Sequence, residues 1–263
     1  MTLRIGSVPY LNAKPQVDWF HSADCDADAK ITYAVPSQLA RMLRDDNLNV
    51  ANVSIFEAFQ NPELLLIPDI SISAYGAVKS VRLFSKTPLE EIQSVALDTS
   101  SLTSAALTRI LLAEQFHITP RCEHHAPNLE AMLAVCDAGL IIGDLKLFDL
   151  MPHVTVYDLG SGWEELTGLP FVYACWLARR DRVSDEMIRA LTDAKNWGLQ
   201  RLETLAQKWS VEFRLPYDRC ADYLMNVMNY DLTPLQMEGL FAFQRKCYEH
   251  GLIDAVRPLH FAR

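Results

Sequence analysis

The chain alternates short apolar runs with helical stretches, and it does so in two separate sets. In the first set, the apolar runs predict strands at 3–8, 31–35 and 50–54. A helix is expected from Pro36 or Ser37 to Asp45, between the last two of these strands. Such alternation predicts an α/β protein with parallel strands joined by helical crossovers. A pair of strands is expected over 70–84, followed by a short helix that opens at 87–89.

The α/β pattern then starts again. The second set predicts strands at 95–98, 139–142 and 154–158, and helices at 101–116 and 128–136. About 90 residues are enough for a compact lobe of its own. After the apolar run at 171–176 the pattern becomes helical to the end of the chain.

Two of these last helices carry clear start signals. Ser184 is expected to cap one long helix with inward-facing side chains at Met187, Leu191, Leu202 and Leu205. Residues 233–236 form a capping box with Pro234 at the first helical position, and Gly251 is expected to follow the end of this helix. We expect these C-terminal helices to pack on the first lobe.

This organisation predicts two lobes connected by two crossings, near 83–86 and 172–176. Residues 1–84 plus 176–263 would form lobe 1, and 85–175 would form lobe 2. A ligand cleft is expected between the lobes, because small-molecule sites concentrate at such boundaries.

Composition limits the partners. The 263 residues carry a formal net charge of −9, which argues against nucleic acid and anionic membrane surfaces, although a small anion could still be held by local dipoles. Six cysteines without a C-x-x-C spacing suggest reduced thiols rather than zinc or disulfides. The N-terminus lacks the pattern of a secretion signal, and no stretch approaches the roughly 20 apolar residues of a membrane span, so a cytoplasmic location is expected.

A cluster of hydroxyl side chains is the first candidate site. It contains Thr99, Ser100, Ser101, Thr103 and Ser104, directly between a predicted strand and a predicted helix. The first turn of a helix presents unpaired N–H groups and a partial positive charge, so hydroxyls there can complete a cradle for a carboxylate. Alternatively, one of them is an ordinary N-cap and the others are solvated.

Other polar residues follow predicted strands at their carboxyl ends, where α/β sheets bind ligands. Tyr10 and Asn12 follow the first strand, and Ser54 ends the strand at 50–54. Asn12 could instead be a helix N-cap between two prolines. Gly143 and Asp144 follow the strand at 139–142, where a Gly-Asp pair is often only a turn.

Several kinds of chemistry are not indicated. The adjacent pair His124 and His125 point in opposite directions on a helix or strand, and no carboxylate or cysteine lies at ligand spacing, so a surface position is expected and no metal site. The sequence contains no G-x-S-x-G, H-E-x-x-H, P-loop or dinucleotide fingerprint, so no cofactor is expected. Glycines and aromatics at 160–163 and 166–171 suit a cleft wall or an ordinary loop.

Taken together, the motifs resemble those of a known family over nearly the whole chain. These motifs are Val8–Pro15, Pro36–Ser37, Val53–Ser54 with Glu57, Val78–Val81 with Ser85, Leu97–Ser104, Ile142–Asp144 and Asp158–Trp176. They resemble chorismate dehydratases of the futalosine route to menaquinone, whose two-lobed fold resembles type II periplasmic binding proteins. The related 1,4-dihydroxy-6-naphthoate synthases share the fold but differ at the N-terminal motif. This chain departs from the family pattern at Asn49, Asn52 and Ile55.

The resemblance implies a reaction in which chorismate, a dicarboxylate, loses its C4 hydroxyl and its C3 proton. It implies that Asn12 and Ser80 contact the reacting ring and the departing hydroxyl. We expect Ser100, Ser101, Thr103, Ser104 and their amides to hold a substrate carboxylate. Further substrate contacts are expected from Tyr10, Ser54, Thr99, Gly143, Asp144 and Phe171.

No acidic residue or histidine in these motifs is an obvious base. The substrate's own enolpyruvyl carboxylate could remove the proton, with Lys14 as a source of electrostatic help. Two other functions stay open: the naphthoate synthase, and a non-catalytic protein that binds small anions on the same fold. The sequence leaves the oligomeric state open.

Overall fold

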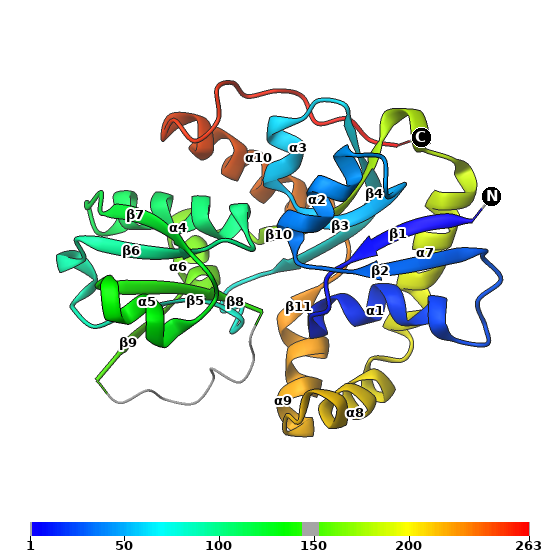
Figure 1. Cartoon of the computed structure of the whole chain (residues 1–263), viewed down its shortest axis with the longest axis horizontal. Helices are drawn as coiled ribbons and strands as arrows, with labels where there is room; N and C mark the ends of the chain where they lie inside the picture. Colours follow the sequence, from blue (N-terminus) through cyan, green and yellow to red (C-terminus); the bar gives the residue numbers. More distant parts are fainter. Residues whose placement is uncertain (1, 144–152, 263) are drawn as a thin grey trace. The chain divides into compact units, whose positions relative to one another are not determined.

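The computed structural model describes residues 2–143 and 153–262, which belong to two compact units (Figure 1). Unit 1 comprises Met1–Ser73, Val172–Thr233 and Arg257–Arg263, and unit 2 comprises Ala74–Phe171 and Pro234–Val256. Each unit is built on its own mixed sheet with helices packed on it. The expected α/β class is confirmed.

The sheet of unit 1 has the strand order β11-β4-β10-β3-β1-β2. Its strands are β1 (Leu3–Ser7), β2 (Ala29–Tyr33), β3 (Val50–Ser54), β4 (Leu64–Ala74), β10 (Phe171–Arg179) and β11 (Met228–Asn229). β1 runs parallel to β2 and β3, and β10 runs antiparallel to β3. Because Ile5 pairs with Val50, the carboxyl ends of β1 and β3 lie at the same edge of the sheet.

Helices surround this sheet. They are η1 (Leu11–Ala13), α1 (Lys14–Val17), η2 (Asp18–His21), α2 (Pro36–Arg44), α3 (Phe56–Gln60), η5 (Arg180–Arg182), α7 (Asp185–Leu199), α8 (Leu202–Phe213), α9 (Tyr217–Asp222) and η6 (Tyr223–Val227). α2 begins at Pro36 as predicted, since the fixed φ of proline suits the first helical turn. The core joins the sheet to α7 through fully buried side chains such as Ile5, Trp176 and Leu191.

The single long helix predicted from Ser184 is wrong, because it is two helices. Ser184 does cap α7, and its hydroxyl accepts a hydrogen bond from the Met187 N–H at 3.2 Å. α7 ends at Leu199, and Arg201 leaves the helical region with φ −130° before α8 begins. Gly198, in the last turn of α7, disfavours continuation of the helix and is the local signal near this break.

The sheet of unit 2 has the order β7-β6-β8-β5-β9. Its strands are β5 (Val81–Ser85), β6 (Ser94–Asp98), β7 (Arg121–His125), β8 (Ala138–Ile142) and β9 (Thr155–Asp158). β6 runs parallel to β7 and β8, and β5 runs antiparallel to β8 and β9. The carboxyl ends of β6, β8 and β9 therefore share one edge with the start of β5. The strand pair expected over 70–84 is divided, since β4 and β5 lie in different sheets.

The helices of unit 2 include one from the C-terminal part of the chain. They are η3 (Leu89–Glu91), α4 (Leu102–Gln115), α5 (Leu129–Val135), α6 (Leu159–Thr167) and α10 (Pro234–Glu249). Among the residues described, no helix combines the length and apolar character needed to cross a bilayer.

α10 corrects the expected packing of the C-terminal helices. It begins at Pro234 as predicted, and Gly251 beyond its end has φ 65°. α7, α8 and α9 belong to unit 1 as expected, but α10 packs within unit 2. The Phe243 ring on α10 lies 4.8 Å from the Phe171 ring and 6.0 Å from the Trp163 ring, centroid to centroid. The aromatic face of α10 is buried there, which is why 176–263 does not form one lobe with 1–84.

Candidate functional site

The hydroxyl-rich turn of unit 2 lies at the start of α4. Ser101 is the N-cap: its hydroxyl accepts a hydrogen bond from the Ser104 N–H at 3.2 Å and donates to Ser104 Oγ at 3.0 Å. Ser100, Thr103 and Ser104 are buried as well, whereas Thr99 is exposed. The N-cap alternative therefore holds for Ser101, but three other hydroxyls are not simply solvated. This end of α4 combines backbone donors with buried hydroxyls, as an anion site requires.

Asp98 stabilises this turn by accepting hydrogen bonds from it. Its Oδ1 accepts hydrogen bonds from the Ser100 N–H at 2.8 Å and from the Ser100 hydroxyl. Its Oδ2 is buried without a hydrogen-bond partner in the described part of the chain. Burial raises the pKa of Asp98, while the two hydrogen bonds from Ser100 act in the opposite direction. Because the Ser100 hydroxyl donates to Asp98 and the Ser101 hydroxyl donates to Ser104, both are poorer donors for a substrate carboxylate than the Ser104 hydroxyl.

Ser80 and Gly143 are brought together at the same sheet edge. The Gly143 N–H donates to the Ser80 carbonyl at 2.8 Å, next to the pairing of Val81 with Ile142. Ser80 is buried at the start of β5. Ser80, Gly143 and the 98–104 turn thus all lie at the edge where parallel strands end, the usual position of ligand sites in α/β sheets.

Asp158 holds the backbone in front of Ser80. Its carboxylate accepts the N–H groups of Val78 and Lys79 at 2.9 and 2.7 Å. It also caps α6 by accepting from Gly160 and Ser161 at 2.9 and 3.2 Å. The sequence motifs contain Asp98 and Asp158 but predict no role for either residue. The signal that could have found them is an aspartate at the end of a strand with a turn or helix directly after it.

Asn12 is the most informative residue of unit 1. It lies in η1 after β1, and its amide oxygen is buried without a hydrogen-bond partner among the described residues. An unpaired buried acceptor costs about 1–3 kcal/mol, so such an atom favours a role in ligand binding. The helix-cap alternative is wrong, because Tyr10 precedes η1, Ala13 precedes α1, and neither helix has a side-chain cap. Ser54 is buried at the carboxyl end of β3, on the same sheet edge.

Lys14 follows Asn12 and is buried in an aromatic cage. Its Nζ lies 3.9 Å from the Trp209 ring centroid, 4.8 Å from that of Tyr33 and 6.0 Å from that of Phe213. Burial lowers the pKa of Lys14, Asp18 raises it, and Lys208 lowers it further. The cage attaches the η1–α1 segment to α8 and so supports the backbone that carries Asn12.

The departures from the family pattern at Asn49 and Asn52 are partly compensated by hydrogen bonds. Asn52 Nδ2 donates to Gln16 Oε1 at 3.1 Å, and Trp176 Nε1 donates to the same oxygen at 2.8 Å. Asn52 Oδ1 is buried without a hydrogen-bond partner among the described residues. Asn49 Oδ1 accepts from the Arg4 N–H at 2.8 Å, and Ile55 is fully buried. Ser54 still pairs with Ala174 on β10.

Phe171, a predicted substrate contact, lies in a hydrophobic core. Phe171 is 1% exposed, and its ring centroid lies 5.2 Å from that of Trp163 and 4.8 Å from that of Phe243. This packing gives Phe171 a place in the core of unit 2, and its contact with substrate stays a prediction. Asp144 lies outside the described residues.

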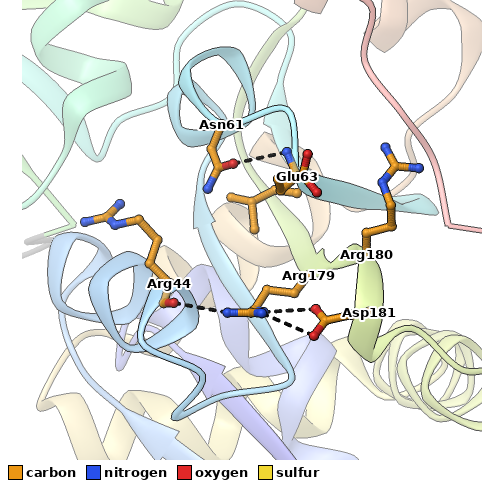
Figure 2. A pocket seen from close by; sticks show the side chains of 7 residues that line it. Arg44, Asn61, Glu63, Arg179, Arg180 and Asp181 are labelled. Carbon is orange, nitrogen blue, oxygen red and sulfur yellow. Dashed lines mark hydrogen bonds and ion pairs between the residues drawn. The ribbon is translucent and has the colours of Figure 1, made fainter.

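A separate pocket of unit 1 contains none of the predicted site residues (Figure 2). It has a volume of about 470 Å³ and is lined by Arg44, Asn61, Glu63, Leu64, Arg179, Arg180 and Asp181. Arg44 is paired with Glu57 at 2.6 Å, and Arg179 is paired with Asp181 at 3.0 Å. Its charges are thus largely satisfied within the protein.

The fold identifies the class of protein. Two solved structures match nearly the whole chain: protein AF1704 from Archaeoglobus fulgidus has a TM-score of 0.77, 16% identity and coverage of 96% of this chain and 98% of that one. The periplasmic aliphatic sulphonate binding protein SsuA from Escherichia coli has a TM-score of 0.66, 14% identity and coverage of 97% and 94%. The chain therefore has the fold of periplasmic binding proteins.

Sequence similarity identifies the family. The model of the menaquinone biosynthesis family matches residues 3–249, so the chain belongs to this family. It is 34% identical to the chorismate dehydratase of Thermus thermophilus, over 81% of this chain and 85% of that enzyme.

Proposed function

We propose that the protein is a chorismate dehydratase, which converts chorismate to 3-[(1-carboxyvinyl)oxy]benzoate and water. The observation that carries this proposal is the 34% identity with the Thermus enzyme, which extends over most of both chains. The substrate is then a small dicarboxylate, and the acidic chain needs local donors rather than net positive charge to bind it. The cytoplasmic location and the absence of nucleic-acid and membrane partners stay predictions.

The start of α4 suits one of the two substrate carboxylates. Removal of the C3 proton places negative charge on the ring carboxylate as a dienolate, and formation of the aromatic ring drives loss of the C4 hydroxyl. The Ser104 hydroxyl and the amides of the first helical turn offer donors for that charge, and Ser101 and Thr103 are buried in the same turn. Loss of one such donor costs on the order of 3 kcal/mol in oxyanion sites.

Asn12 and Ser80 are each proposed to act on the reacting part of the substrate. The unpaired amide oxygen of Asn12 is an acceptor suited to the hydroxyl at C4. Ser80 is fixed through its carbonyl by Gly143 and through the preceding backbone by Asp158. Tyr10, Ser54 and Gly143 are proposed to complete the substrate contacts, together with Thr99, Asp144 and Phe171.

The enolpyruvyl carboxylate of the substrate is proposed as the base. Asp158 is occupied by four backbone N–H groups, and Asp98 is buried beneath the hydroxyl turn. Neither carboxylate is arranged as an accessible general base. The protein then contributes position and exclusion of water rather than a proton acceptor.

The experiment is to incubate purified protein with chorismate and separate the products by chromatography with mass detection. Release of the enolpyruvyl benzoate, one water lighter than chorismate, is expected. Binding of chorismate without turnover would instead favour a small-anion-binding protein. Turnover of cyclic dehypoxanthinyl futalosine with no effect on chorismate would favour the naphthoate synthase.

A further inference from the structure

Three metal-ligand side chains converge on the sheet of unit 2, on the strand next to the hydroxyl turn, where the His125 carbonyl accepts the Thr99 N–H at 3.0 Å. Glu123 and His125 lie on β7, and Cys136 follows the end of α5. The carboxylate oxygen, the imidazole nitrogen and the thiol sulfur all lie within 4.8 Å of one another. The expectation that no carboxylate or cysteine accompanies the histidine pair is thus wrong for His125, because folding brings Cys136 to it. We propose that Glu123, His125 and Cys136 bind a zinc ion.

The strand geometry explains why these three residues meet. Side chains alternate along a strand, so Glu123 and His125 share one face of β7 while Cys122 and His124 point to the other. On the neighbouring strand, Ala96 is in register with Glu123 and belongs to the same buried cluster as Cys136. Its small side chain leaves room for the three donors to approach one another.

Cys136 is the fixed member of the group. It is 2% exposed, and the carboxylate of the next residue, Asp137, accepts the N–H groups of Gln93 and Ser94 at 3.0 and 2.9 Å and the Ser94 hydroxyl at 2.9 Å. Burial is the main reason that the pKa of Cys136 is raised, so the thiol is protonated in the absence of metal. Binding of zinc would form the S–Zn bond and release this proton to solvent.

Glu123 and His125 are the adjustable members, since their side chains are 40% and 27% exposed. Donors of a tetrahedral zinc lie about 3.5 Å apart, so these two side chains need to move by about 1 Å. His125 Nε2 already lies 3.5 Å from Glu123 Oε2. Arg121 contacts the other carboxylate oxygen at 3.1 Å, from a largely exposed position, and leaves Oε2 for the metal.

The donor set favours zinc over harder cations. One thiolate and one imidazole suit zinc, whereas magnesium and calcium prefer oxygen ligands alone. The thiolate and the carboxylate together balance the two positive charges of the ion. Three protein ligands leave the fourth position of a tetrahedral zinc to water.

The test is to titrate the metal-free full chain with zinc chloride by calorimetry, and with cobalt chloride by absorption. We expect one zinc per chain and a thiolate-to-cobalt charge-transfer band. Cys136→Ser should abolish that band, and His125→Gln should weaken zinc binding about tenfold or more. His124→Gln and Cys122→Ser are matched controls, because they change the same residue types on the opposite face of β7, and both should bind as the unchanged chain does.

Glu123→Gln provides a second variant if Cys136→Ser does not fold, since residue 123 is partly exposed. It should weaken zinc binding with an unchanged far-ultraviolet circular dichroism spectrum. Absence of stoichiometric zinc binding would overturn the proposal, as would equal weakening in His124→Gln and His125→Gln. The readout is metal binding alone, so it does not depend on whether the protein dehydrates chorismate.

Discussion

The carboxylate of Asp158 accepts the backbone N–H of Lys79 at 2.7 Å, and Lys79 has a positive φ of 63°. A residue other than glycine rarely adopts this conformation without support. The hydrogen bond therefore fixes the backbone immediately before Ser80, while other bonds to the same carboxylate cap α6. One side chain thus determines both a helix start and the position of a proposed catalytic residue.

Asp158→Ala is expected to destabilise the protein by about 2–4 kcal/mol, because it removes a helix cap and leaves the Val78 and Lys79 amides without their acceptor. Urea denaturation measures this loss. Asp158→Asn keeps one acceptor oxygen, so its free energy of unfolding should lie between those of Asp158→Ala and the unchanged chain. Equal stability of Asp158→Ala and the unchanged chain would contradict the assigned role.

Asn12→Ala and Ser80→Ala are each expected to lower kcat for chorismate by about 100-fold or more, because each removes one hydrogen-bonding group from the reacting part of the substrate. Their circular dichroism spectra and unfolding midpoints should stay close to those of the unchanged protein. Asn47→Ala is a suitable control, because Asn47 is exposed. Normal turnover in both site variants would reject their assignment.

Lys14→Met tests the aromatic cage through pH. Burial holds the pKa of Lys14 below its ordinary value of 10.5, so the unfolded chain binds this proton more tightly than the folded protein. The free energy of unfolding should therefore rise with pH between the lowered pKa and 10.5, and Lys14→Met should lack this rise. Tyr33 stays neutral in this window, since burial raises its pKa to about 12.

The groups that face Lys14 supply the control for this measurement. Lys208 is paired with Asp18 at 2.7 Å. Lys208→Met should keep a smaller rise, because burial, the main cause of the lowered Lys14 pKa, is unchanged while the contribution of Lys208 is lost. Denaturation curves recorded between about pH 7 and about pH 10 measure how the free energy of unfolding of each variant changes with pH. A rise of the same size in Lys14→Met would show that another group is responsible.

Asp98→Asn tests the buried carboxyl beneath the hydroxyl turn. Burial raises the pKa of Asp98 above 3.8, so its contribution to stability is present at low pH and is lost as the pH rises through the folded pKa. The neutral amide keeps the bond from the Ser100 N–H and removes the buried charge. At about pH 7 the variant should be at least as stable as the unchanged protein, and this advantage should shrink at about pH 5. A clearly less stable variant at the higher pH would contradict this account.

Strongly apolar elements could be predicted from the sequence. The predicted bounds of β3 match the observed ones, because every residue of Val50–Ser54 is buried and the strand lies inside the sheet, between β10 and β1. Such a run carries its signal locally. β7 was missed, because it is an edge strand with exposed and half-buried polar residues and so has no apolar pattern.

α6 was left open as a loop or cleft wall, since Gly160 and Gly162 disfavour a helix. The structure shows why a glycine is needed at 162: a Cβ there would lie 1.9 Å from the Tyr157 hydroxyl oxygen. Packing against Tyr157 on the preceding strand β9 requires this glycine, and helix propensity alone does not report that contact.

The candidate site, like the fold, could be predicted only in part. The hydroxyl turn and Asn12 were found from their positions after strands, which is local information. The aromatic cage of Lys14 and the approach of Cys136 to His125 depend on side-chain contacts between separate elements. Periodicity and motif spacing carry no record of such contacts.

The packing of α10 has a consequence for how the protein is made. Residues 74–171 leave the ribosome as one stretch, but Trp163 and Phe171 have no Phe243 to pack against until residues 172–233 have also been synthesised. The newly made chain therefore carries an uncovered aromatic face through much of its synthesis. Chaperones that hold exposed apolar surface would act in this interval, and a stop codon before residue 234 would make that exposure permanent.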